Sequence, residues 1–113
     1  MSDVGISGPE GISARLREQA ARGAIRFTFH AQGEMDEEDV TPRDVREVLL
    51  DARVIENYPG HERGPCCLVC GQDRARRYLH VVCTSALDVV IIITVYEPRA
   101  PKWVTPFERG KRP

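Results

Sequence analysis

The chain has 113 residues, a length that suits one domain able to bury roughly two-thirds of the surface of its unfolded chain. Its 42% hydrophobic and 29% charged residues are ordinary for a soluble globular protein, and the formal net charge of −1 argues against nucleic-acid binding driven by the charge of the whole molecule. No apolar run reaches membrane-spanning length, and residues 1–11 are polar and Gly-rich without a signal-peptide pattern. We therefore expect a cytoplasmic protein with reduced thiols and no membrane partner.

The first third of the chain predicts a helix and a short strand. The helix of residues 12–22 would carry a narrow apolar stripe, formed by Ile12, Leu16 and Ala20. Residues 25–29 alternate in hydrophobicity and favour a strand, whereas residues 30–39 show only a weak helical pattern.

A second helix has the clearest start signal in the sequence. Thr41 is a good N-cap, Pro42 suits the first helical position, and Asp44 complements the positive end of a helix. An apolar stripe at helical spacing follows, formed by Val45, Val48 and Leu49. We therefore expect a helix that begins at Pro42.

The second half of the chain predicts strands. Four segments are rich in β-formers and separated by turn residues: 53–58, 66–71, 78–84 and 89–96. Short connections between the later ones imply antiparallel neighbours. The segment after them contains three interior prolines, so it cannot form a long regular element, and Trp103 and Phe107 are expected to pin it to the body.

These elements predict an α+β fold. We expect an antiparallel sheet of about four to five strands with two to three N-terminal helices packed on one face. The domain would span residues 10–104, between a flexible leader at residues 1–9 and a basic tail at residues 105–113.

The charge is distributed unevenly along this domain. Residues 34–56 hold nine acidic and three basic residues, a balance of −6, whereas residues 74–113 hold eight basic and three acidic residues, a balance of +5. The basic C-terminal third can attract phosphate locally. A solvated tail and a charged helix face explain the same pattern, so both interpretations stay open.

Alternation along residues 78–84 separates two faces of the predicted sheet. Leu79, Val81 and Cys83 would face the helices, and Tyr78, His80, Val82 and Thr84 the open side. If the loop to the next strand has odd length, His80 lies opposite Thr94, and Tyr78 lies opposite Tyr96. That register would gather an imidazole, a hydroxyl and two phenols on the open face, and a slip of one residue would separate them.

Three of the four cysteines occur in the segment GPCCLVCGQ. A tetrahedral zinc site needs thiolates within about 4 Å of one another, whereas Cys66 and Cys70 of an extended strand lie about 13 Å apart and Cys67 points to the opposite face. We therefore expect small apolar strand residues and neither metal nor cofactor. One hairpin register places Cys67 opposite Cys83 and Cys70 opposite His80, which leaves open a redox-sensitive Cys67–Cys83 pair or a reactive Cys70. A structural zinc site remains a third alternative.

Several short motifs follow one another in a fixed order between Ile25 and Trp103: FTFHAQGEM, VIENYP, CLVCGQ, LHVVCT, IIITVYEP and KW. Together they resemble the uncharacterised bacterial family catalogued as domain of unknown function 4258. That family resembles, more distantly, the RelE-like toxins and the barnase/RelE group of small metal-independent ribonucleases, and its members often occur beside small zinc-finger antitoxins. The resemblance implies a RelE/barnase-like fold, a role as an mRNA-cleaving toxin, an RNA substrate and a zinc-finger antitoxin partner. The family usually has Arg where this chain has Glu34, which would alter a phosphate site at that position.

Metal-independent RNA cleavage needs a base for the 2′-hydroxyl proton, an acid for the leaving oxygen and cations for the phosphate. Histidine suits the first two roles because its pKa lies near neutrality. We expect His30 and His80 in these roles, with Tyr96 orienting a phosphate or stacking on a base. Binding of phosphate and base would fall to a second group: Arg99, Lys102 and Trp103.

Each of these residues also has a structural explanation. His30 can cap a helix, His80 can be a cross-strand residue, Tyr96 a rim aromatic and Trp103 the clamp of the C-terminal tail, while the two cations can lie on the surface. Three classes of function therefore stay open. They are a metal-independent endoribonuclease, a non-catalytic protein- or nucleic-acid-binding module of the same fold, and a zinc- or redox-dependent protein.

Overall fold

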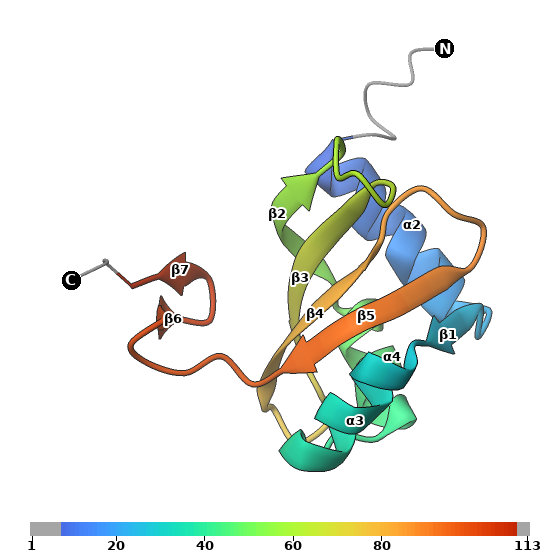
Figure 1. Ribbon diagram of the computed structural model, residues 1–113. Helices are drawn as coiled ribbons and strands as arrows, with labels where there is room; N and C mark the ends of the chain where they lie inside the picture. The colour runs from blue at the N-terminus through green and yellow to red at the C-terminus, as the bar shows by residue number, and fades with distance from the viewer. Residues whose placement is uncertain (1–7, 111–113) are drawn as a thin grey trace.

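The body of the protein is a five-stranded sheet packed with helices, and a small two-stranded hairpin stands beside it (Figure 1). The computed structural model describes residues 8–110. In chain order the elements are α2 (Pro9–Ala21), β1 (Ile25–Phe27), α3 (Phe29–Glu38), α4 (Pro42–Leu50), β2 (Arg53–Tyr58), β3 (Cys66–Gln72), β4 (Tyr78–Thr84), β5 (Val90–Tyr96), β6 (Trp103–Thr105) and β7 (Glu108–Arg109). The predicted leader, residues 1–9, lies for the most part outside the described residues, and α2 begins at Pro9.

The sheet is mixed rather than antiparallel. Its strand order is β1-β5-β4-β3-β2, and all neighbours are antiparallel except β1, which runs parallel to β5. The α+β class is confirmed, whereas the expected all-antiparallel sheet is wrong. The reason is that β1 reaches β5 through two helices and three strands instead of a tight turn, and such a long connection permits a parallel pair.

The helices are also arranged differently from the prediction, because they do not all precede the sheet. β1 lies between α2 and α3 in the chain. α2 and α4 pack on each other and against β2 and β3, whereas α3 packs along β5. Two helices therefore cover one face, called here the inner face, and the third covers the end of β5 that β1 is too short to reach (Figure 1).

Local sequence signals explain where the helices begin. Thr41 and Asp44 form a reciprocal capping box, in which each side chain accepts a hydrogen bond from the backbone N–H of the other at 3.1 and 2.9 Å. The predicted start of α4 is therefore confirmed. The segment predicted as a weak helical turn forms a full helix, α3, from Phe29 to Glu38, because Thr28 caps it by accepting a hydrogen bond from the Ala31 N–H at 3.0 Å.

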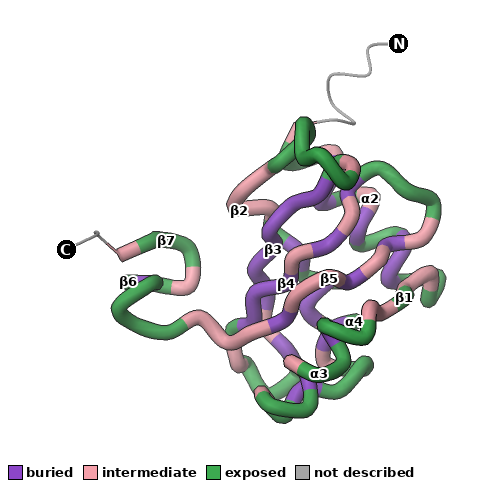
Figure 2. Tube along the Cα trace, in the orientation of Figure 1, coloured by how far each residue is buried: buried purple, intermediate pink, exposed green. Residues whose placement is uncertain are grey.

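The core lies between the inner face and the helices. Its members alternate along the strands and recur at helical spacing. Figure 2 shows the buried stretches of the strands and helices in purple. They include the predicted stripes of α2 and α4 and the predicted inner row of β4: Ile12, Leu16, Ala20, Val45, Val48, Leu49, Leu79, Val81 and Cys83. The assignment of the two faces of β4 is confirmed. Within residues 8–110, no helix combines the length and apolarity needed to cross a lipid bilayer.

The register between β4 and β5 differs from the expected one by two residues. His80 lies opposite Tyr96 and Val82 opposite Thr94, with a register shift between Val82 and Cys83. The loop after β4 is longer than the expected turn, and Ile93 is inserted as a bulge between Ile92 and Thr94. Because the change is an even number of residues, His80, Thr94 and Tyr96 stay on one face.

Candidate functional site

The face of the sheet opposite α2 and α4, called here the outer face, carries a row of four chemically distinct side chains. Arg53, Cys70, His80 and Tyr96 lie opposite one another on β2, β3, β4 and β5. The pairing of Cys70 with His80 and of Cys67 with Cys83 agrees with the predicted hairpin register.

His80 is the central residue of this row, and the C-terminal hairpin buries it completely. Its exposed fraction is 0%. Nδ1 lies 3.0 Å from the Tyr96 hydroxyl and Nε2 lies 2.5 Å from the Pro106 carbonyl oxygen. The Trp103 ring covers the imidazole edge-on, with 4.3 Å between ring centroids. Both nitrogens of His80 are thus occupied by partners within the chain.

These contacts fix the tautomer and the charge of His80. A carbonyl oxygen only accepts hydrogen bonds, so Nε2 must carry the proton and donate a hydrogen bond to the Pro106 carbonyl. Nδ1 then accepts a hydrogen bond from the Tyr96 hydroxyl. Burial lowers the pKa of His80, although the Pro106 carbonyl and Glu56 act in the opposite direction. Burial also raises the pKa of Tyr96, so the phenol stays protonated as the donor. The geometry and the pKa directions therefore describe the same neutral pair.

The hairpin is held on the outer face by side chains. Trp103 is 4% exposed, and the Arg109 guanidinium lies over its ring at 4.8 Å from the centroid. Arg109 also donates two hydrogen bonds to the Glu56 carboxylate, at 2.6 and 2.8 Å. These hydrogen bonds lower the pKa of Glu56. An arginine near the end of the chain thereby joins β7 to β2.

Around this anchor lies a partly exposed surface that we call the aromatic–cation face. It consists of Arg53, Tyr58, Tyr78, Lys102, Phe107 and Arg109. Its three rings, Tyr58, Tyr78 and Phe107, are between 36% and 39% exposed. Phe107 meets Tyr78 edge-on at 5.6 Å, and Arg53 lies over Phe107 at 4.8 Å from the centroid. The expectation that Trp103 and Phe107 pin the tail to the body is confirmed.

The two predicted phosphate-binding cations have different surroundings. Arg99 makes a bidentate ion pair with Glu38, at 3.0 and 2.9 Å, and also contacts Glu97 at 3.3 Å. Lys102 instead lies over the Tyr96 ring at 5.6 Å from the centroid. Both line a pocket of 220 Å³ together with Tyr96 and Trp103. Arg99 is therefore committed to carboxylates of its own chain, while Lys102 is available to a ligand.

His30 lies on another element, away from the row that contains His80. It is on the first turn of α3, mostly exposed, with Nε2 3.3 Å from a carboxylate oxygen of Glu34. That carboxylate accepts a hydrogen bond from the Val95 backbone N–H at 3.1 Å. Glu34 thus satisfies a backbone donor on β5, which gives this residue a structural role. The structure brings together His80, Tyr96, Lys102 and Trp103, but not His30.

The cysteines are strand residues with free thiols. The sulfur atoms of Cys67 and Cys83 lie 4.0 Å apart in the core, and the hydrogen bond with Cys67, together with burial, raises the pKa of the Cys83 thiol. Burial raises the pKa of Cys70 to about 11, so this residue stays a thiol beside His80 and is a poor nucleophile at neutral pH. Among residues 8–110, no group of three or more His, Cys, Asp or Glu side chains is placed to hold a metal ion.

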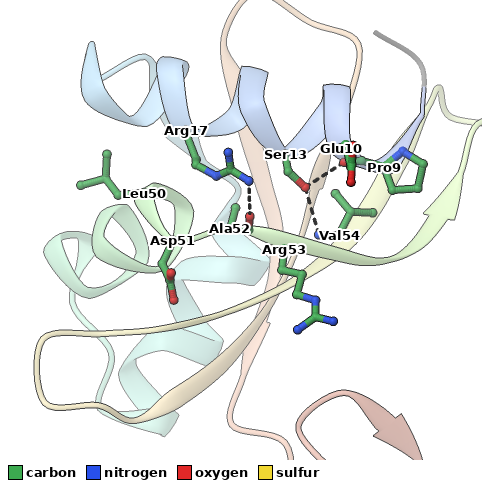
Figure 3. Close-up of a pocket in the computed structure, with 9 residues that line it drawn as sticks. All are labelled: Pro9, Glu10, Ser13, Arg17, Leu50, Asp51, Ala52, Arg53 and Val54. Atoms are coloured by element: carbon green, nitrogen blue, oxygen red, sulfur yellow. Dashed lines mark hydrogen bonds between the residues drawn. The ribbon is translucent and has the colours of Figure 1, made fainter. Parts of the chain in front are cut away.

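A larger hollow of 490 Å³ lies where α2 passes the end of α4 and the start of β2 (Figure 3). Several of its polar groups make hydrogen bonds within the fold. The Ser13 hydroxyl accepts from the Val54 N–H at 3.2 Å and donates to the Pro9 carbonyl at 2.8 Å, and Arg17 reaches the Ala52 carbonyl at 3.4 Å. These hydrogen bonds attach α2 to the edge strand β2. The hollow is therefore a weaker candidate site than the row that contains His80.

Several contacts of the candidate site have no signal in the sequence. Arg109 and Glu56 are separated by 53 residues, and the Pro106 carbonyl that accepts a hydrogen bond from His80 is a backbone group. Arg53 and Phe107 meet only because the tail folds back as a hairpin. The excess of basic residues in the C-terminal third indicated a cation such as Arg109, but it did not indicate its carboxylate partner, Glu56.

No curated protein and no solved structure matches the chain significantly. A family model described as a domain of unknown function, DUF4258, matches residues 27–97, from β1 to the residue after β5. The match therefore includes His80 and Tyr96 but ends before the hairpin that covers them. On this evidence, the chain belongs to the DUF4258 family.

Proposed function

We propose that the protein is a nucleic-acid-binding module that holds single-stranded RNA on its aromatic–cation face. The observation that carries this proposal is the meeting of partly exposed rings and cations on this face, where Arg53 lies over the Phe107 ring and Phe107 meets Tyr78 edge-on. Proteins that bind single strands combine such cations with rings on which bases stack, at roughly 1–3 kcal/mol per base.

Charge supports the same assignment. Within residues 8–110, Lys102 and Arg53 stack on rings and form no ion pair with a carboxylate. Both can therefore reach phosphate oxygens without first breaking an ion pair, unlike Arg99 and Arg109, which are bound to Glu38 and Glu56. A strand that crosses this face would meet rings for its bases and free cations for its backbone.

A second candidate function, metal-independent RNA cleavage by a RelE-like toxin, is favoured by the His80–Tyr96 pair beside Lys102. Cleavage would need the hairpin to move, because His80 is fully buried and its Nε2 donates to Pro106. A small zinc-finger antitoxin would then act as a partner that holds the hairpin closed. The closed geometry favours binding over cleavage, since a buried neutral histidine cannot exchange protons with a substrate.

Binding is tested by fluorescence anisotropy with a labelled single-stranded RNA, its DNA equivalent and an RNA duplex. The wild type is expected to bind the single strands more tightly than the duplex, with affinity falling as salt rises by a slope of about 0.7 per phosphate contact. Phe107→Ala and Lys102→Ala should each weaken binding about 5- to 100-fold, because each removes a stacking or phosphate contact. Leu87→Ala, on an exposed loop outside the face, is the matched control and should have no effect.

Cleavage is tested with the same RNA and nuclease-free protein. Binding without cleavage supports the proposed module. Cleavage that is lost in His80→Ala and kept in His30→Ala would replace the module by the ribonuclease. Absence of both binding and cleavage would refute both candidate functions.

A further inference from the structure

We propose that Cys67 and Cys83 form a redox-active dithiol, in which hydrogen peroxide oxidises Cys67 and Cys83 then closes a reversible disulfide. The two residues lie directly opposite each other on β3 and β4, and their sulfur atoms are 4.0 Å apart. Directly opposed residues of an antiparallel pair have Cα atoms about 4.5–5.5 Å apart, within the range of about 4.4–6.8 Å that a disulfide spans. Rotation of the two side chains therefore closes the bond without a change of strand register.

The surroundings of the two thiols make them chemically unequal. The hydrogen bond from Cys83 and the charge of Arg15, a residue of α2, lower the pKa of Cys67, although burial acts in the opposite direction. The same hydrogen bond, together with burial, raises the pKa of Cys83. Arg15 Nε is buried and has no hydrogen-bond partner among the described residues, so this N–H is still available to an anion that forms in the core. Cys67 is thus suited to attack as a thiolate, and Cys83 to follow as the second thiol.

The other two cysteines lack these features. Burial raises the pKa of Cys66 and raises that of Cys70 to about 11. The residues opposite them on β4 are Thr84 and His80, neither of which is a thiol. The pair formed by Cys67 and Cys83 is therefore distinguished from the remaining thiols by both geometry and charge.

The reaction balances with hydrogen peroxide as the oxidant. The Cys67 thiolate attacks one peroxide oxygen, the O–O bond breaks, and the released hydroxide takes up the proton that Cys67 had lost, which leaves Cys67 as a sulfenic acid. The Cys83 sulfur then attacks the Cys67 sulfur, the S–O bond breaks, and the hydroxyl group leaves as water with the Cys83 proton. Two thiols and one peroxide thus give one disulfide and two water molecules, and two electrons pass from sulfur to oxygen.

Burial of the pair selects a small oxidant. Cys67 and Cys83 are both 0% exposed, beneath a helix that a hydrogen bond from Arg15 to the Ser85 carbonyl attaches to the loop after β4. Local opening of this helix admits a molecule little larger than water but not a bulky thiol reagent, so oxidation by peroxide should be slow and confined to the pair. The pair lies on the inner face, away from the aromatic–cation face, so this inference is independent of the proposed function.

Treatment with hydrogen peroxide, followed by intact mass and peptide mapping without reductant, tests the disulfide. The wild type should lose two hydrogen atoms and give a cross-link between Cys67 and Cys83 that dithiothreitol reverses. The double variant Cys66→Ser, Cys70→Ser is the matched control, because it keeps only the pair, and it should form the disulfide at the rate of the wild type. A wild type that keeps all four thiols until urea unfolds it, or a double variant that forms no disulfide, would overturn the proposal.

Single variants test the order of the two steps, with folding checked by circular dichroism. Peroxide should leave Cys83→Ser with a sulfenic acid on Cys67, detected by a sulfenic-acid reagent after unfolding, whereas Cys67→Ser should show none on Cys83. Arg15→Gln should slow disulfide formation several-fold, and Arg15→Lys, which keeps the charge, should restore much of the rate. Arg17→Gln is the control on the same helix, since Arg17 is exposed and reaches only the Ala52 carbonyl at 3.4 Å. Equal slowing in Arg15→Gln and Arg17→Gln would contradict the role of Arg15.

Discussion

Replacement of Trp103 by Ala is predicted to release the C-terminal hairpin while the five-stranded sheet stays folded. Trp103 is 4% exposed, and a buried Trp removes about 150–250 Å² from water, which corresponds to about 4–6 kcal/mol at about 25 cal/mol per Å². Once released, the hairpin regains backbone freedom, which offsets part of this loss. The net loss in the free energy of unfolding is therefore expected to be smaller, about 1–3 kcal/mol.

The other anchors cannot hold the hairpin alone. The Arg109–Glu56 ion pair is partly exposed and contributes about 0–1 kcal/mol, and Phe107 is buried on one side only. Once Trp103 is gone, His80 loses its cover and its buried partner at Pro106.

Urea denaturation measures the free energy, and amide hydrogen exchange locates the change. In Trp103→Ala the amide of Gly110, which donates to the Lys102 carbonyl at 2.7 Å, should lose its protection while the amides of β3 and β4 keep theirs. Val104→Ala, a neighbour that is 66% exposed, serves as the control and should change neither quantity. Loss of protection across β3 and β4, or unchanged protection of Gly110, would refute the view of the hairpin as a separately docked unit.

The remaining predictions concern β5, pH and the thiols. Glu34→Ala should cost about 1–3 kcal/mol by chemical denaturation, since the Val95 N–H loses its acceptor, and a cost no larger than that of His30→Ala would contradict this role. Because burial lowers the pKa of His80 below 6.5, the unfolded chain takes up this proton first as pH falls, so stability should decline below pH 6.5 down to the folded pKa. In His80→Gln, stability should stay constant down to about pH 4.5. Below that pH the lowered pKa values of Glu56 and Glu38 cause a loss of stability in both proteins. Melting temperatures of the two proteins that fall in parallel between pH 6.5 and 4.5 would contradict this role of His80. The thiols of Cys67, Cys70 and Cys83 should react with a thiol reagent only on unfolding, and fast reaction of all three in the native protein would contradict their burial.

Local signals in the sequence were enough to predict the elements that depend on neighbours in the chain. The N-cap at Thr41 and the two faces of β4 follow from spacing alone, whereas the pairing of Cys67 with Cys83 was one hairpin register that the spacing allowed. The site depends on distant contacts, which spacing does not encode. The bulge at Ile93 places Tyr96 opposite His80. The parallel pairing of β1 with β5 depends on the whole chain between these two strands. The burial of His80 depends on Trp103 and Pro106, more than 20 residues away, so its role as a covered residue could not be predicted.

The most direct test of the central claim, RNA binding on the aromatic–cation face, is a two-dimensional NMR titration with a short single-stranded RNA. The proposed function predicts that the largest shifts lie at Arg53, Tyr78, Lys102 and Phe107, fade as salt is raised, and fall away in Phe107→Ala. Shifts confined to α2 and α4, or no shifts at low salt, would contradict it.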